Sequence, residues 1–90
     1  MIIARRFYVS GRVQGVGFRW FAHEAASREG VHGWVRNQPD GSVEVFVEGE
    51  AESLQRLEAK LRRGPASARV DTFHSEDHAP AGRFTEFEIR

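Results

Sequence analysis

The sequence predicts an α+β fold in which two amphipathic helices interrupt the strands of a mostly antiparallel sheet. Three observations predict this class: short segments with apolar residues at every second position, two segments with apolar residues at three-and-four spacing, and glycine or proline between them. The chain has 90 residues, which leaves no room for a second domain of ordinary size. Residues 1–90 are therefore expected to form a single domain.

The first strand is predicted over Ala4–Gly11, where Phe7 and Val9 alternate with polar residues and so place one face in the core. The first helix is predicted over Phe18–Glu29, in which apolar residues recur at three-and-four spacing. Gly30 is expected to end this helix, because glycine adopts the left-handed conformation that closes many helices.

A hairpin is predicted next, with arms at Val31–Asn37 and Ser42–Gly49. The residues between them, Gln38–Gly41, have Pro at the second and Gly at the fourth position, as in a type I turn. Trp34 is expected in the core. The second arm is expected to direct its valines into the core: Val43, Val45 and Val47. The glutamates of this region are interpreted as a solvated face: Glu44, Glu48 and Glu50.

The second helix is predicted from an apolar stripe that stops before Gly64 and Pro65: Ala51, Leu54, Leu57 and Leu61. Two further strands are predicted at Ala68–Phe73 and Thr85–Ile89, joined by a polar connection at His74–Arg83. The order β-α-β-β-α-β, with an additional C-terminal strand, matches a ferredoxin-like α/β sandwich with both helices on one sheet face. This fold hosts many functions, so function has to be argued from the sites.

Composition excludes several classes of protein. Thirteen basic and thirteen acidic residues cancel, so no net positive charge draws the whole molecule to nucleic acid. No stretch approaches the ~20 apolar residues that a membrane-spanning helix needs. There is no cysteine, which excludes disulfides and thiolate metal sites and favours a reducing compartment. We therefore expect a cytoplasmic monomer that binds neither nucleic acid nor membranes.

The segment GRVQGVGFR, between the first strand and the first helix, has the features of an anion site. The first turn of a helix has backbone N–H groups without intrahelical partners, and no Ser, Thr, Asp or Asn from Gly11 to Arg19 could cap them. Gly15 and Gly17 allow successive N–H groups to point into one concavity. Arg19 in the first turn opposes the helix dipole by roughly 0.3–1 kcal/mol unless an anion lies nearby. The alternative is a glycine-rich turn that serves packing alone, with Arg19 in water.

The glycine spacing matches neither of two common nucleotide motifs. Gly11, Gly15 and Gly17 do not follow the pattern G-x-G-x-x-G, and no Gly-Lys-Ser/Thr comes after them. Asn37, at the end of the first hairpin arm, is a second candidate site residue, because an amide that donates and accepts at once can hold a water molecule. The alternative is an asparagine that only shapes the turn.

GRVQGVGFR followed by GWVRNQPDGSVEV closely resembles the two signature segments of the acylphosphatase family, and LRRGPASARV and FTEFEIR also look like this family. The resemblance implies a ferredoxin-like enzyme that hydrolyses acyl phosphates to a carboxylate and inorganic phosphate without a metal or organic cofactor. It implies that Arg19 binds the phosphoryl group and that Asn37 orients the attacking water. The backbone amides expected to complete the phosphate cradle are those of Gln14, Gly15, Val16, Gly17 and Phe18.

The resemblance leaves the physiological substrate open among carboxyl phosphates, carbamoyl phosphate and protein aspartyl-phosphates, with inorganic phosphate as product and competitive inhibitor. Two other classes of function are alternatives. An RNA-binding module would use Tyr8 and Phe46 for base stacking, and a phosphate-sensing module would have the same cradle without turnover. His74 and His78 suggest a metal site, but an extended segment would separate them by ~13 Å. His23 and His32 are interpreted as surface or packing residues.

Overall fold

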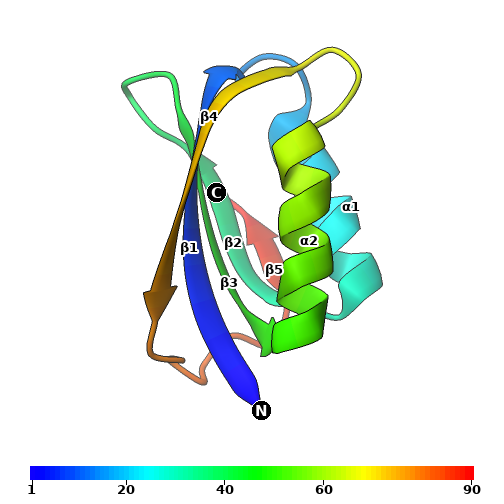
Figure 1. Ribbon diagram of the computed structural model, residues 1–90, viewed down its shortest axis with the longest axis vertical. Helices are drawn as coiled ribbons and strands as arrows, with labels where there is room; N and C mark the ends of the chain where they lie inside the picture. Colours follow the sequence, from blue (N-terminus) through cyan, green and yellow to red (C-terminus); the bar gives the residue numbers. More distant parts are fainter.

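A five-stranded sheet has both helices on one of its faces in the computed structural model, which describes residues 1–90 (Figure 1). The elements in chain order are β1 (Ile2–Arg12), α1 (Phe18–Glu29), β2 (His32–Asn37), β3 (Val43–Glu50), α2 (Ala51–Arg63), β4 (Arg69–His78) and β5 (Phe87–Ile89). The strands lie in the order β4-β1-β3-β2-β5. No helix is long and apolar enough to cross a membrane.

The pairing of the strands confirms the predicted fold class and element order. β1 pairs antiparallel with both β3 and β4, and β2 pairs antiparallel with β3. Only β2 and β5 run parallel. A turn is present at the predicted place, since the N–H of Gly41 donates to the carbonyl oxygen of Gln38 at 3.1 Å.

The core lies between the sheet and the helices because the strands alternate as predicted. Phe7, Val9 and Val35 are fully buried on the helix side, together with the three valines of β3. The helices contribute the residues that match their predicted stripes: Phe18, Ala22, Ala25, Ala26, Leu54, Leu57 and Leu61. Trp34 is buried as expected, but in a separate cluster that also contains Ala4 and Phe46.

Three expectations about these elements were wrong. β4 continues through His78, so the first half of the predicted polar connection is strand, held by its antiparallel pairing with β1. Ala51 is exposed, because it is the first residue of α2 and lies before the turn that meets the sheet. Glu44 and Glu48 are buried, with 3% and 6% of their surface exposed, and only Glu50 remains solvated.

The buried glutamates belong to the sheet face opposite the helices, which we call the open face. Trp34, Phe46 and Phe84 form an aromatic cluster there, and arginine side chains lie over these rings. Glu48 accepts hydrogen bonds from the backbone N–H groups of Ala81 and Gly82, in the connection before β5. Aromatic residues, arginines and this connection therefore remove the glutamates from solvent.

Candidate functional site

The loop that precedes α1 presents a run of backbone donors. Gly17 caps the helix in a left-handed conformation, with φ of 79°, and no side chain caps the helix N-terminus. Gly15 is also left-handed, with φ of 73°. From Gln14 to Trp20, no backbone N–H group donates a hydrogen bond within the chain. These unpartnered donors and the positive end of the helix dipole together suit an anion.

Space does not explain the two glycines of this loop. A Cβ atom added at Gly15 or Gly17 would meet no other atom within 4 Å. Both residues have a positive φ, which side chains other than glycine rarely adopt. The glycines are therefore required by the backbone conformation of the loop.

Arg19 lies at the start of α1 with a half-buried side chain that is fixed at one end. Its Nη1 donates a hydrogen bond of 3.0 Å to the carbonyl oxygen of Arg90. The N–H of Arg90 donates in turn to the carbonyl oxygen of Val35 at 2.8 Å, which ties this segment to β2. The guanidinium has further N–H groups that can bind an anion in a bidentate way. Arg19 is thus positioned, and does not simply point into water.

Asn37 is the last residue of β2 and precedes the hairpin turn that Gln14 contacts. Side chains alternate along a strand, so Asn37 points to the helix side, as Val35 does. Its Oδ1 is buried and accepts no hydrogen bond from the chain. A buried acceptor without a partner is costly, and a bound water would satisfy it. This favours a water-holding asparagine over one that only shapes the turn.

Gln14 joins the two halves of the site, a role that its sequence position did not indicate. Its Nε2 donates to the carbonyl oxygen of Gln38 at 2.8 Å and to that of Ser42 at 3.0 Å. The side chain thereby clamps the loop before α1 to the hairpin turn that follows Asn37, and both lie at the top of Figure 1. The one signal in the sequence is an amide among glycines and valines, which is too common to identify a clamp.

Comparison with known proteins identifies the family. A family model described as Acylphosphatase matches residues 5–89. An acylphosphatase of Methylococcus capsulatus is 52% identical over 81 residues, which cover 90% of this chain and 88% of that protein. An acylphosphatase of Anaeromyxobacter dehalogenans is 50% identical over 88 residues, covering 98% of this chain and 95% of that protein. The chain belongs to the acylphosphatase family.

A solved structure agrees with this family assignment. The crystal structure of acylphosphatase from Bacillus subtilis matches this chain with a TM-score of 0.94 at 33% identity, and the match covers 100% of this chain and 99% of that one. The resemblance seen in the sequence, the ferredoxin-like fold and the enzyme class are thereby confirmed. The roles of individual residues are taken up below as proposals.

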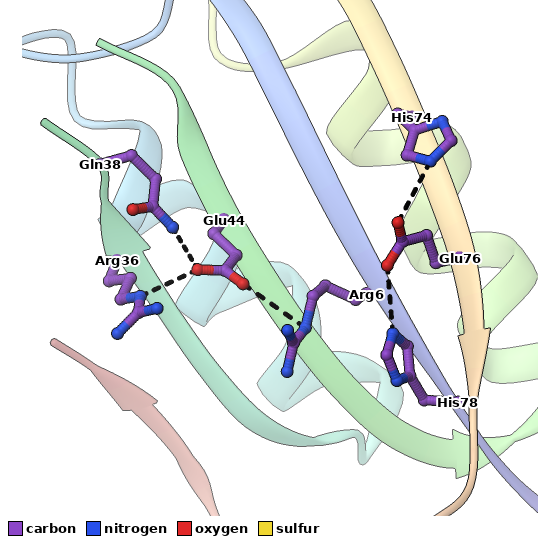
Figure 2. A network of polar contacts seen from close by, with 7 residues as sticks. All are labelled: Arg6, Arg36, Gln38, Glu44, His74, Glu76 and His78. Atoms are coloured by element: carbon purple, nitrogen blue, oxygen red, sulfur yellow. Dashed lines mark hydrogen bonds and ion pairs between the residues drawn. The ribbon is translucent and has the colours of Figure 1, made fainter. Parts of the chain in front are cut away.

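The remaining candidate residues of this acylphosphatase-family chain lie elsewhere. Phe46 is buried beneath Arg6 and Phe84, so it is not available to stack on a base. His74 and His78 lie on the open face of β4, where each contacts the carboxylate of Glu76, at 3.4 and 3.2 Å (Figure 2). The hydrogen bond from His78, ahead of that from His74, lowers the pKa of Glu76 below its ordinary value.

His23 and His32 differ in their packing. The ring of His23 stacks on Trp20 and also contacts Phe87, as expected of a packing residue, whereas His32 is exposed.

In the hairpin turn between β2 and β3, hydrogen bonds from the Ser42 hydroxyl and then its N–H lower the pKa of Asp40. Asp40 therefore stays ionised at neutral pH, and its hydrogen bonds with Ser42 stabilise the turn that Gln14 contacts.

Proposed function

We propose that the protein hydrolyses the carboxyl-phosphate bond of acyl phosphates by in-line attack of water. Arg19 and the backbone amides of residues 14–18 hold the phosphoryl group, and Asn37 orients the water. The observation that carries this proposal is the run of unpartnered backbone N–H groups at the start of α1, with Arg19 fixed beside it. Fixed donors of this kind stabilise the charge on a transferred phosphoryl group.

Little further machinery is needed for this reaction. An acyl phosphate is a mixed anhydride whose leaving carboxylate is stable at neutral pH, so no acid has to protonate it. Catalysis then consists of holding the phosphoryl group, spreading its charge and placing the water in line. Asn37 cannot act as a base near neutral pH, so a phosphate oxygen of the substrate accepts the water proton in this mechanism.

The test is hydrolysis of benzoyl phosphate, with EDTA present, by the wild type, Arg19→Ala and Asn37→Ala. Arg19→Ala should lower kcat/KM by about 10³–10⁵-fold and weaken inhibition by inorganic phosphate, because the guanidinium contacts the phosphoryl group. Asn37→Ala should lower kcat by about 10²–10³-fold, by analogy with the loss of one fixed transition-state contact, and leave the inhibition constant of phosphate unchanged.

Arg28→Ala is the matched control, since Arg28 is an exposed arginine in the last turn of the same helix. Its activity should equal that of the wild type. Equal loss of phosphate affinity in Arg19→Ala and Asn37→Ala would refute the division of roles. A wild type that binds phosphate but hydrolyses no faster than buffer would refute the enzyme and leave a phosphate sensor.

We also propose that the protein works in the cytoplasm as a monomer and without a metal. Support comes from the small size of the chain, the balance of its basic and acidic residues and the lack of cysteine. Turnover that survives EDTA tests the metal-free reaction, and light scattering coupled to gel filtration tests the monomer.

A further inference from the structure

The carboxylate of Glu44 is buried on the open face and is contacted by three side chains (Figure 2). The Nε of Arg36 donates to its Oε1 at 2.9 Å, and the side-chain amide of Gln38 donates to the same oxygen. The Nε of Arg6 lies 3.4 Å from its Oε2. β3 lies between β1 and β2, which brings Arg6 and Arg36 to opposite sides of Glu44.

Two of these partners are the chain neighbours of Asn37. Arg36 and Gln38 reach Glu44 on the open face, and the side chain between them points to the helix side. Glu44 thus contacts the side chains of the residues immediately before and after Asn37, and so restrains the backbone of residues 36–38. The orientation of the Asn37 amide depends on this short length of backbone.

Gln38 also carries the connection through to the phosphate cradle. While its side chain is held by Glu44, its carbonyl oxygen accepts the hydrogen bond from Nε2 of Gln14. Gln14 begins the run of backbone donors before α1. A continuous series of hydrogen bonds therefore runs from Glu44 on one face of the sheet to the cradle on the other.

We propose that Glu44 is a positioning residue for the reaction: it touches neither phosphate nor water, but fixes Asn37 at the distance and angle to the cradle that in-line attack needs. This inference rests on the proposed function. Hydrogen bonds to a buried charge are stronger than those between neutral groups, so Glu44 restrains Arg36 and Gln38 more firmly than a neutral side chain would.

The test variant is Glu44→Gln, which keeps the shape and removes the charge. It should lower kcat by about 10- to 100-fold, the cost of a small misplacement of a catalytic group. The inhibition constant of inorganic phosphate should stay within about twofold of the wild type, because Arg19 and the cradle amides keep their places. Activity is normalised to the folded fraction measured by circular dichroism.

Glu48→Gln is the matched control. Glu48 is a buried carboxylate on the same strand and the same face, but its partners are the N–H groups of Ala81 and Gly82, away from Asn37. Glu48→Gln should lower the free energy of unfolding, because the N–H groups of Ala81 and Gly82 lose a charged acceptor. The kcat of the folded variant should equal that of the wild type. An equal fall of kcat in both variants would show a merely structural role and overturn the proposal.

A double-mutant cycle separates positioning from general damage. If Glu44 acts through Asn37, then Glu44→Gln should cause no further loss of kcat when Asn37→Ala is already present. Additive losses would overturn the proposal. A readout independent of activity is the side-chain amide resonance of Asn37 in NMR spectra, which should shift or broaden in Glu44→Gln and stay in place in Glu48→Gln.

These outcomes also distinguish the inference from the proposed function. A wild type without hydrolytic activity refutes the function, and an NMR shift of Asn37 in Glu44→Gln would then still report the structural link. A fully active Glu44→Gln refutes the positioning role alone.

Discussion

Helices α1 and α2 cover the same face of the sheet, but the charges of their first turns differ. α2 begins with Glu52 and ends with cations, namely Lys60, Arg62 and Arg63, and this distribution complements the helix dipole. α1 has no acidic residue in its first turn and has Arg19 there instead. Its last turn contains Arg28, and the helix ends at a left-handed Gly30. A cation in the first turn therefore distinguishes α1 from α2.

This contrast separates stability from function within one layer. α2 buries three leucines and follows the charge rules that stabilise a helix. The start of α1 breaks them where backbone donors and Arg19 face a proposed phosphate, and natural sequences break local rules mostly at functional sites. The two helices should then respond to mutation in opposite ways, and three predictions test this.

The largest effect on stability is expected from Leu57→Ala in α2. Leu57 is fully buried against the sheet, so the variant should lose about 2–5 kcal/mol of unfolding free energy. Its kcat and the inhibition by phosphate should match the wild type wherever the variant is folded. Urea unfolding and benzoyl phosphate hydrolysis measure the two quantities. The control is Gln55→Ala, an exposed change in α2, whose free energy of unfolding should stay within about 0.5 kcal/mol of the wild type. A loss of phosphate affinity in Leu57→Ala would contradict the separation of stability from function.

Arg19→Ala should have the opposite profile. Without phosphate, its unfolding free energy should lie within about 1 kcal/mol of the wild type, because relief of the dipole repulsion offsets the lost hydrogen bond to Arg90. Phosphate at 100 times its dissociation constant should stabilise the wild type by about 2.7 kcal/mol and the variant far less. Thermal unfolding with and without phosphate measures this. Arg28→Ala should keep the full response to phosphate, and a full response in Arg19→Ala would remove Arg19 from the site.

The same contrast shows what sequence could predict. Periodicity predicted both helices and the central strands, because their burial is repeated every few residues along the chain. The uncapped start of α1 was predictable from local signs, namely the glycines and the absence of a capping residue from Gly11 to Arg19. The sequence predicts the end of this strand at Phe73, because HSEDH has no apolar alternation. In the structure, pairing with β1 continues the strand through His78.

Contacts between strands could not be predicted from local sequence patterns. Glu44 is buried because the strand order places β3 between β1 and β2, and no pattern within β3 records which arginines become its neighbours. Gln14 could not be identified as a clamp because its acceptors, Gln38 and Ser42, are brought near only by the folded hairpin. Local sequence features therefore predict the candidate site residues, while the contacts of Gln14 and Glu44 required the structure.

The smallest effect concerns the link between the two helices. Glu29, near the end of α1, accepts hydrogen bonds from Arg56 and Lys60 of α2, at 2.8 and 3.3 Å. The bond from Arg56 is the main reason why the pKa of Glu29 lies below its ordinary value of 4.5. A lowered pKa in the folded state means that the ionised pair adds stability above pH 4.5 and loses it as the pH falls through the folded pKa.

Glu29→Gln should therefore be less stable than the wild type by about 0.2–1 kcal/mol at neutral pH, since both cationic partners are partly exposed. The difference should shrink below pH 4.5 and vanish once Glu29 of the wild type is protonated. Urea unfolding across this range measures it, with Glu24→Gln, which alters an exposed glutamate of the same helix, as the control. Because the pair lies at the opposite end of α1 from Arg19, turnover should not change, and a fall in kcat would show that the end of α1 also shapes the site.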